Sequence, residues 1–428
     1  MLDRKIAPPL HQFISFRLQQ PQKRVLDNGI RLFFFENPQL DLIHFTLRIK
    51  AGSIFEHDKL LANSTYSLLI ESVRGKTPAD VEDFLDYYGA VFNASVNLEY
   101  VSLQFIIPKS SCRTVLPFIC SFIISPGFQE DSLSRYKERK GKELEYNQRK
   151  VSFRSGQWMY NTLLNSSIPA GTILEKKHIE SLSVLQMEEY HRQTFCSENM
   201  TLFLTGNVDE EIMEKVCSEI GRIPSNMPAD YPDVFAASLP ENRLIFEKRE
   251  DSMQSSIILC RRGLAYEDEE RRPFSVLSTL LGGYFGSRLM QNLREKNGFT
   301  YGVYCSASYF GSGSLFYLNS DVNIDKTDMA IEECRKEMLR LIDEEVGVEE
   351  LDTVKNYMAG SLLRKLDGTV NYMREYALWD SAGLDEQELE RVMTAIRKAD
   401  AQYIRYLAGK YLNPADFATI VVGNMLNK

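Results

Sequence analysis

The chain has 428 residues, of which 44% are hydrophobic and 25% are charged, and its formal net charge is −9 at pH 7. This composition is typical of soluble globular proteins and excludes a disordered chain or a disulfide scaffold, and the length favours two domains because one domain usually takes ~100–200 residues. The negative charge would repel a phosphate backbone, so we expect no nucleic-acid partner. Pro8 and Pro9 stand where a signal peptide needs an apolar core, and no uncharged stretch reaches the ~20 apolar residues of a membrane span, so we expect a cytoplasmic protein without a membrane partner.

The cysteines and histidines carry no recognisable metal spacing. Seven cysteines and five histidines are scattered along the chain. None of the cysteines forms a C-x-x-C pair, and no two histidines are three or four residues apart. We therefore expect reduced thiols and no local histidine-based metal site.

The first half alternates strand and helix patterns. Asn28-Gly29, between apolar residues, predicts a hairpin with a two-residue turn. Apolar and polar residues alternate from Ile43 to Ile49, which predicts a strand with one buried face and His44 on the polar one. Thr77 and Pro78 predict the start of a helix that stops at Gly89. The remaining patterns predict helices at 60–73 and 135–150, a buried helix and turn within 114–129, and strands at 101–107 and 201–207.

The second half repeats parts of the first. Arg31-Leu-Phe-Phe-Phe-Glu36 resembles Arg243-Leu-Ile-Phe-Glu247, and Leu204-Thr-Gly-Asn207 resembles Val421-Val-Gly-Asn424 at nearly the same offset. Similarity at this spacing indicates a duplicated domain, because solenoid repeats recur every ~20–50 residues. We predict an α+β fold of two homologous tandem domains, each a mainly antiparallel sheet packed with helices. Their predicted bounds are 1–223 and 241–428, with a proline-rich linker at 224–240.

Several short sequences of the chain occur in an order and spacing that resemble one protein family. The first half contains Lys50-Ala-Gly-Ser53, Glu56, Arg74-Gly-Lys-Thr77, Tyr88-Gly-Ala-Val-Phe-Asn-Ala94 and Leu202-Phe-Leu-Thr-Gly-Asn-Val-Asp209. The second half contains Leu281-Gly-Gly-Tyr-Phe-Gly-Ser-Arg-Leu289, Leu293-Arg-Glu-Lys-Asn-Gly-Phe-Thr-Tyr301 and Val348-Glu-Glu-Leu-Asp-Thr-Val-Lys355. Across nearly the whole chain this resembles the pitrilysin-type zinc metallopeptidases, the family of insulinase and the mitochondrial processing peptidase.

The zinc motif of that family is missing from this chain. In the family, a helix carries H-x-x-E-H, in which two histidines bind zinc and the glutamate activates water. The corresponding window, Ser64-Thr-Tyr-Ser-Leu-Leu-Ile-Glu71, contains no histidine, and we interpret its one carboxylate, Glu71, as a capping or solvent-facing group. Glu143 or Glu145 is the candidate remnant of the family's acidic ligand, although a solvated helix face is the better interpretation. We predict no metal or other cofactor in this chain and no activity by the chain alone.

The second half keeps a pair of residues that the resemblance makes functional. In the family, an Arg and a Tyr of the second domain hold the substrate carbonyl or its oxyanion, and Arg294 and Tyr301 match them. A guanidinium and a phenol can together stabilise charge that develops on a peptide oxygen. The structural alternative is a surface arginine paired with Glu295 and a strand tyrosine half in the core.

A second candidate site lies in the first half. The run Phe92, Asn93, Ala94 and Ser95 matches the edge strand against which the family adds its substrate peptide as a further strand. An ordinary strand is an equally good interpretation. Gly282, Gly283 and Gly286 do not have the spacing of a phosphate-binding loop, and we assign them to backbone bending.

The resemblance implies the non-catalytic subunit of a heterodimeric peptidase. Its partner would be a homologous chain that bears H-x-x-E-H and holds the zinc, and its substrate a peptide or unfolded polypeptide. Arg294 and Tyr301 would act in trans on the partner's active site. The alternatives are a structural or scaffolding subunit without a role in proteolysis and a stand-alone peptidase with another nucleophile or metal, which the scattered cysteines and histidines do not support.

Overall fold

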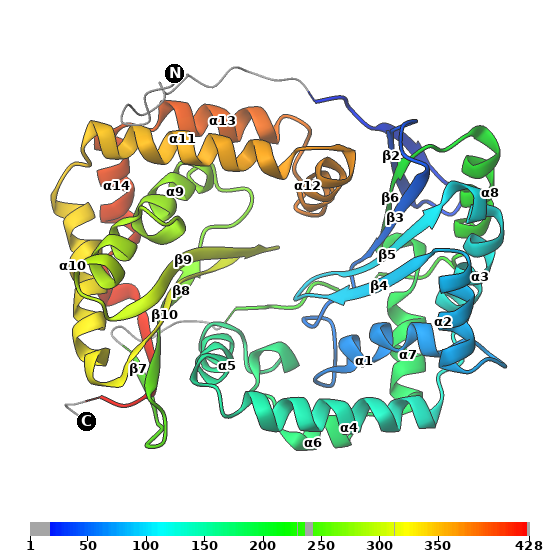
Figure 1. Ribbon diagram of the computed structural model, residues 1–428, viewed down its shortest axis with the longest axis horizontal. Helices are drawn as coiled ribbons and strands as arrows, with labels where there is room; N and C mark the ends of the chain where they lie inside the picture. Colours follow the sequence, from blue (N-terminus) through cyan, green and yellow to red (C-terminus); the bar gives the residue numbers. More distant parts are fainter. Residues whose placement is uncertain (1–17, 229, 236–242, 312, 426–428) are drawn as a thin grey trace, which may run out of the picture.

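The computed structural model describes residues 18–228, 230–235, 243–311 and 313–425, and its helices and strands form two halves (Figure 1). The strands of the first half are β1 (Gln22–Val25), β2 (Arg31–Glu36), β3 (Leu42–Ile49), β4 (Val91–Val96), β5 (Val101–Pro108) and β6 (Met200–Gly206). Its helices are α1 (Leu61–Ser67), α2 (Pro78–Tyr87), α3 (Cys112–Ile124), α4 (Glu130–Asn147), α5 (Val151–Leu163), α6 (Lys176–Glu180), α7 (Val184–Thr194) and α8 (Glu210–Ile220).

The second half has the same kinds of element. Its strands are β7 (Leu244–Lys248), β8 (Gln254–Gly263), β9 (Thr300–Phe310), β10 (Gly313–Asn323) and β11 (Ala418–Gly423). Its helices are α9 (Arg271–Ser278), α10 (Thr327–Asp343), α11 (Val348–Lys365), α12 (Thr369–Ser381), α13 (Glu388–Lys398) and α14 (Ala401–Tyr411). Two π-helical turns, η5 (Thr279–Gly283) and η6 (Met290–Lys296), lie between α9 and β9.

The two sheets have the same topology, which confirms the predicted α+β fold of tandem domains. The first sheet has the strand order β1-β2-β6-β3-β5-β4 and the second has β7-β11-β8-β10-β9. Without β1, each half has five strands. Counted in chain order, they lie across the sheet in the same order in both halves: first, fifth, second, fourth, third. In each sheet one pair is parallel, β2 with β6 and β7 with β11, and the other pairs are antiparallel. A duplicated unit accounts for this agreement.

Each half contributes one helix to the other half. Helix α5 of the first half packs on β8 and β11, where Met159 and Leu163 join a core with Ile258 and Ile420. Helix α12 of the second half packs on β2 and β6 in a cluster with Phe33, Phe35, Phe203, Tyr372 and Tyr376. Figure 1 shows α12 beside β2 and α5 beside the second sheet. The helices occupy equivalent places in the two halves, so the exchange is reciprocal and covers one face of each sheet.

Because α12 covers the first sheet, the second face of this sheet is more buried than the sequence pattern predicted. Strand β3 was expected to have one buried face, and Phe45, Leu47 and Ile49 are buried, but Thr46 on the opposite face is also buried. Strand β6 is buried at every residue. A single-strand pattern could not reveal this, because α12 comes from the far half of the sequence.

The predicted hairpin forms, but its loop is longer than expected. Val25 pairs with Arg31, and the amide of Leu26 donates to the carbonyl of Ile30, so three residues, Asp27 to Gly29, form the loop. Gly29 has φ +87°, while Asn28 does not have positive φ. A two-residue type I′ turn needs positive φ at both central residues, whereas a type I turn followed by a left-handed glycine needs only one.

The helix expected at 60–73 is also shorter than predicted. Helix α1 ends at Ser67 and is followed by a 3₁₀ turn, η1 (Leu69–Glu71). By contrast, α2 begins as expected, with Thr77 and Asp80 forming a capping box and Pro78 in the first turn. Helix α4 begins at Glu130, upstream of its predicted start, and α3 confirms the buried helix.

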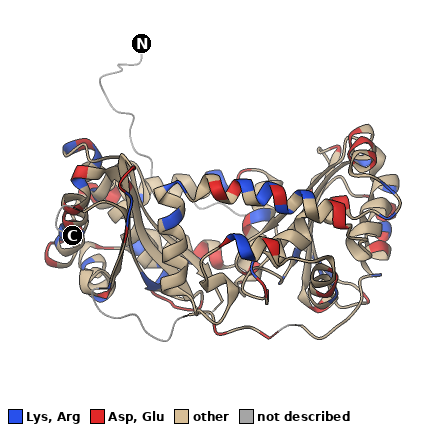
Figure 2. Ribbon diagram, turned by 90° about the horizontal axis from the view of Figure 1, so that it is seen from below, with Lys and Arg blue, Asp and Glu red and all other residues tan. Residues whose placement is uncertain are grey.

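Charged residues of both signs are interspersed on the outer helices (Figure 2). Helix α4, for example, carries Lys140 bonded to Glu143 and Lys142 bonded to Glu138. Within the described ranges, no helix has both the length and the apolar sequence required to cross a bilayer.

Candidate functional site

The last residues of α1 and the turn η1 lie where the family's zinc motif would be, and a buried glutamate holds the start of this helix. The buried carboxylate of Glu56 accepts hydrogen bonds from the amides of Leu60 (3.2 Å) and Ala62 (3.0 Å) and so caps α1. Burial raises the pKa of Glu56 to about 7, against the opposing effect of these two amides. Leu60 is held at φ +71°, a costly conformation for a leucine. The sequence analysis named Glu56 only among the short sequences that resemble the family and assigned it no role.

Two of the acidic residues considered around the lost zinc motif form ion pairs. Glu71, which was expected to cap a helix or face solvent, pairs instead with Arg135 of α4 at 3.0 Å and has 19% of its side chain exposed, and Glu143 pairs with Lys140 at 2.8 Å. The side chains of Glu143 and Glu145 are exposed on α4. Among the residues that the structure describes, no three His, Cys, Asp or Glu side chains lie close enough to hold a metal ion.

The candidate substrate strand lies at the edge of the first sheet. Residues Phe92 to Ser95 belong to β4, which pairs with β5 alone within the part of the chain that the structure describes. Phe92 stacks on Phe105 with ring centroids 4.9 Å apart, and Ala94 packs against the core, while Asn93 and Ser95 are exposed. The other edge of β4 therefore has the unpaired backbone groups that an added strand requires.

The structure brings Arg294 and Tyr301 to one cavity of about 380 Å³ in the second half. Arg294 lies on η6, with its Nε 3.4 Å from Glu295 and its guanidinium 4.7 Å from the ring centre of Phe285. Tyr301 lies near the start of edge strand β9 and is 89% exposed, so it is not the half-buried strand tyrosine of the structural alternative. The pairing of Arg294 with Glu295, by contrast, is the contact that this alternative expected.

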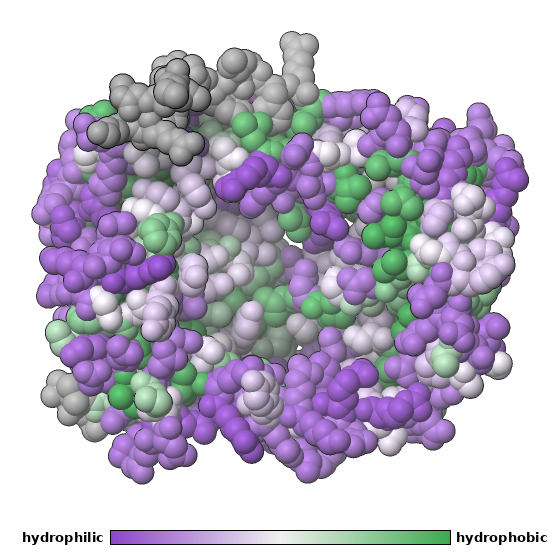
Figure 3. Space-filling view, viewed as in Figure 1, coloured by the Kyte–Doolittle hydropathy of each residue, from purple (hydrophilic) through white to green (hydrophobic). Residues whose placement is uncertain are grey.

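A larger cavity of about 540 Å³ lies between the halves. In the view of Figure 3, which is that of Figure 1, the surface is hollowed at its centre. The residues inside the hollow are less hydrophilic than those around its rim. Four tyrosines line the cavity together with Arg48, Glu56, Lys59 and Glu99; they are Tyr100, Tyr160, Tyr266 and Tyr309. Arg48 stacks on Tyr100 with 4.4 Å between the guanidinium and the ring centre. Neither Arg294 nor Tyr301 is among the described residues that line it.

Sequence reasoning missed most of this larger cavity. Glu99 accepts hydrogen bonds from the hydroxyl of Tyr231 (2.9 Å) and the amide of Gly311 (3.0 Å), which come from distant segments. Burial raises the pKa of Glu99, in opposition to these bonds. The contributing residues share no motif or spacing, so only the fold brings them together.

Comparisons with known proteins agree with this architecture. Residues 181–358 match the family model described as the peptidase M16 inactive domain. A Rickettsia bellii protein named "Uncharacterized zinc protease" is 24% identical over 385 residues, which cover 88% of this chain and 92% of that protein. The chain is a relative of the M16 peptidases. M16 is the pitrilysin-type family, so the resemblance drawn from the sequence is confirmed.

Two further similarities bear on this M16 relative. A Schizosaccharomyces pombe protein named "Probable mitochondrial-processing peptidase subunit alpha" is 20% identical, over 96% of this chain and 88% of that protein. The crystal structure of a peptidase M16 inactive domain from Pseudomonas fluorescens superposes with a TM-score of 0.86 at 20% identity, covering 95% of this chain and 98% of that one. At this identity the structural similarity establishes the shared fold. The M16 relative therefore combines the family's architecture with a first half that lacks the paired histidines.

Proposed function

We propose that this chain is the non-catalytic subunit of a heterodimeric M16 peptidase. It pairs with a homologous chain that carries H-x-x-E-H and zinc, and it supplies Arg294 and Tyr301 to the active site of that partner. The similar protein from Schizosaccharomyces pombe is itself named as a subunit of a peptidase, which supports a role in an assembly.

The position of Arg294 and Tyr301 is the observation that carries the proposal. The two side chains share a cavity on the second half, apart from the residues that line the cavity between the halves of the same chain. A phenol that is 89% exposed has its hydroxyl available to another molecule. An arginine and a tyrosine at one surface cavity are hydrogen-bond donors suited to a carbonyl oxygen of a peptide bound in a neighbouring chain.

The substrate in this proposal is an extended polypeptide. The edge of β4 offers backbone hydrogen bonds to an added strand, and these bonds form irrespective of the peptide's sequence. Asn93 and Ser95 lie exposed along β4, while Phe92 and Ala94 face the core. An unfolded segment meets this requirement, whereas a compact domain has its strands already paired.

The test is reconstitution of the pair with a zinc-bearing M16 subunit and an unstructured peptide. Arg294→Ala and Tyr301→Phe should each lower turnover by about 10²–10³, because each removes a donor to charge that develops in the transition state. Sizing chromatography should show that the complex survives both substitutions. Arg391→Ala is a matched control, since Arg391 is similarly exposed and pairs with Asp385 at 2.8 Å on the second half.

An intact complex with full turnover in both variants would reject the proposal. It would favour a structural or scaffolding subunit without a role in proteolysis. A zinc measurement on the separate subunits belongs to the same experiment, since the metal is expected in the partner and not in this chain.

A further inference from the structure

The segment that carries Arg294 is a π-helical turn and not a regular helix. Within η6 and its cap, the amide of Asn297 donates to the carbonyl of Asn292 at 3.1 Å. The chain then reverses at Gly298, with φ +62°, and the amide of Phe299 donates to the carbonyl of Leu293 at 2.8 Å. Short π-helical segments are rare and occur often at functional sites. The geometry of this turn fixes how far apart Arg294 and the first residues of β9 lie.

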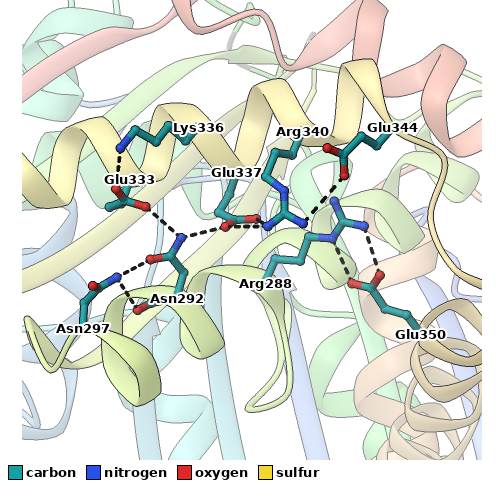
Figure 4. A network of polar contacts seen from close by, with 9 residues as sticks. All are labelled: Arg288, Asn292, Asn297, Glu333, Lys336, Glu337, Arg340, Glu344 and Glu350. Atoms are coloured by element: carbon teal, nitrogen blue, oxygen red, sulfur yellow. Dashed lines mark hydrogen bonds and ion pairs between the residues drawn. The ribbon is translucent and has the colours of Figure 1, made fainter.

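One side chain, Asn292, connects this turn to the helix behind it (Figure 4). Its Nδ2 donates to Glu333 at 3.0 Å and to Glu337 at 2.7 Å, both on α10. Its Oδ1 accepts a hydrogen bond from Nδ2 of Asn297 at 2.6 Å. Asn292 thus joins the start of the turn, its end and α10.

The carboxylates that hold Asn292 are themselves fixed. Glu337 is 3% exposed and also accepts hydrogen bonds from Arg340 at 3.2 and 3.3 Å, while Glu333 accepts one from Lys336 at 2.6 Å. Arg288 lies two residues before the turn, and its guanidinium bonds to both oxygens of Glu350 on α11 at 2.9 and 3.0 Å. The turn is therefore anchored to two helices.

Only an amide of this length meets all three contacts. Asn292 donates two hydrogen bonds and accepts one at the same position, which a carboxylate cannot do because it has no donor when ionised. Aspartate at 292 would also place a third negative charge beside Glu333 and Glu337. Alanine would leave both carboxylates without this partner and would remove the side-chain acceptor of Asn297, which would keep its bonds to the backbone carbonyl of residue 292 at 3.1 and 3.0 Å.

We propose that Asn292 is a positioning residue for Arg294 and Tyr301. It sets the π-helical turn against α10 so that the guanidinium and the phenol share one cavity. This inference rests on the proposed function, because it assigns to Asn292 the alignment of the two donors that the proposed subunit supplies in trans. Small displacements of such groups reduce turnover steeply, since a misplacement of ~1 Å can cost about 10²-fold.

The first test is a double-mutant cycle in the reconstituted pair. Asn292→Ala and Asn292→Asp should lower kcat about tenfold while KM stays unchanged, because peptide binding along β4 is untouched. In a chain that already carries Arg294→Ala and Tyr301→Phe, the same substitutions should have no further effect. An equal loss in both backgrounds would overturn the proposal, since it would show that Asn292 acts independently of the two donors.

The second test uses the isolated chain and does not depend on peptidase activity. Amide hydrogen exchange in residues 290–301 should become faster in Asn292→Ala, while exchange in the first half stays the same. Lys336→Ala is the control, because it removes an exposed partner of Glu333 and leaves Asn292 in place. Unchanged exchange in 290–301 would overturn the positioning role. Faster exchange together with full turnover in Arg294→Ala would instead reject the proposed function and leave the anchor in place.

Discussion

His191 is an example of a residue whose role the sequence could not reveal. It lies in the first core, stacked on Phe195 with 4.5 Å between ring centres, and its Nε2 is 2.9 Å from the carbonyl oxygen of Ile123. Burial lowers the pKa of His191 to about 4, although the bond to Ile123 opposes this effect. The sequence showed only that His191 is isolated from other histidines, and the burial that makes it a core residue depends on packing with distant segments.

We predict that His191 makes the protein sensitive to acid. An unfolded chain binds a proton on this imidazole at a pKa near 6.5, whereas the folded chain does so only at about 4. As the pH falls through this window the unfolded state gains the proton first, so the free energy of unfolding decreases by roughly 3 kcal/mol and then levels off. Urea unfolding from pH 7 to 4 measures this loss.

In His191→Gln, the free energy of unfolding should depend less on pH between 7 and 4, because glutamine cannot take up the proton. His57→Gln is the control, since the His57 side chain is 50% exposed and should leave the slope unchanged. If His191→Gln kept the full slope of the wild type, other groups would have to cause the acid sensitivity.

At the scale of elements, two equivalent hairpins meet at Glu99. Glu99 lies in the β4–β5 turn, and Gly311, whose amide donates to it, follows β9. We predict that Glu99→Ala lowers the free energy of unfolding by about 1–3 kcal/mol, because the partly buried Tyr231 hydroxyl and Gly311 amide lose their acceptor. Glu99→Gln keeps a hydrogen-bond acceptor at this position, so its free energy of unfolding should decrease by less than that of Glu99→Ala. Urea unfolding of the full chain gives both values, and equal stability of Ala, Gln and wild type would show that the hairpins are held by other contacts.

Local signals were sufficient for elements whose ends depend on neighbouring residues. The capping box of Thr77 and Asp80 and the strand alternation of β3 and β5 were readable in sequence, because they need only adjacent residues. The end of α1 at Ser67 was not, since its apolar pattern continues to Val73 while the chain turns at Leu69 to Glu71. The candidate site residues on β4 and η6 came from the family resemblance, whereas neither the partners of Asn292 on α10 nor the cavity between the halves had a signal in the sequence.

At the scale of the molecule, the duplication was visible in sequence but the exchange of helices was not. Similar short sequences near the two ends of each half predicted two related domains. The strand order that the two sheets share agrees with this prediction. The sequences of α5 and α12 do not specify which sheet each helix covers. Their exchange means that each half buries an apolar face only when the other is present.

We therefore predict that the halves are not independently stable. Residues 1–235 produced alone would expose Phe33, Phe35 and Phe203, which α12 covers in the intact chain. Residues 236–428 alone would expose the surface of β8 and β11 that α5 covers. Exposed patches of this kind cause association or aggregation, so each half alone should aggregate or lack fixed tertiary structure, and the two should form a 1:1 complex when co-expressed.

Sizing chromatography and near-ultraviolet circular dichroism of the co-expressed halves measure this outcome. Tyr376→Ala in the second fragment should weaken the complex about tenfold or more, because Tyr376 contacts Phe33 and Phe35 with ring centres 5.2 and 5.4 Å away. Tyr406→Ala, at an exposed position of α14, should leave it intact. Stable, monomeric and fully structured separate halves would mean that the exchanged helices are dispensable, and that the reciprocal packing only orients two domains that fold by themselves.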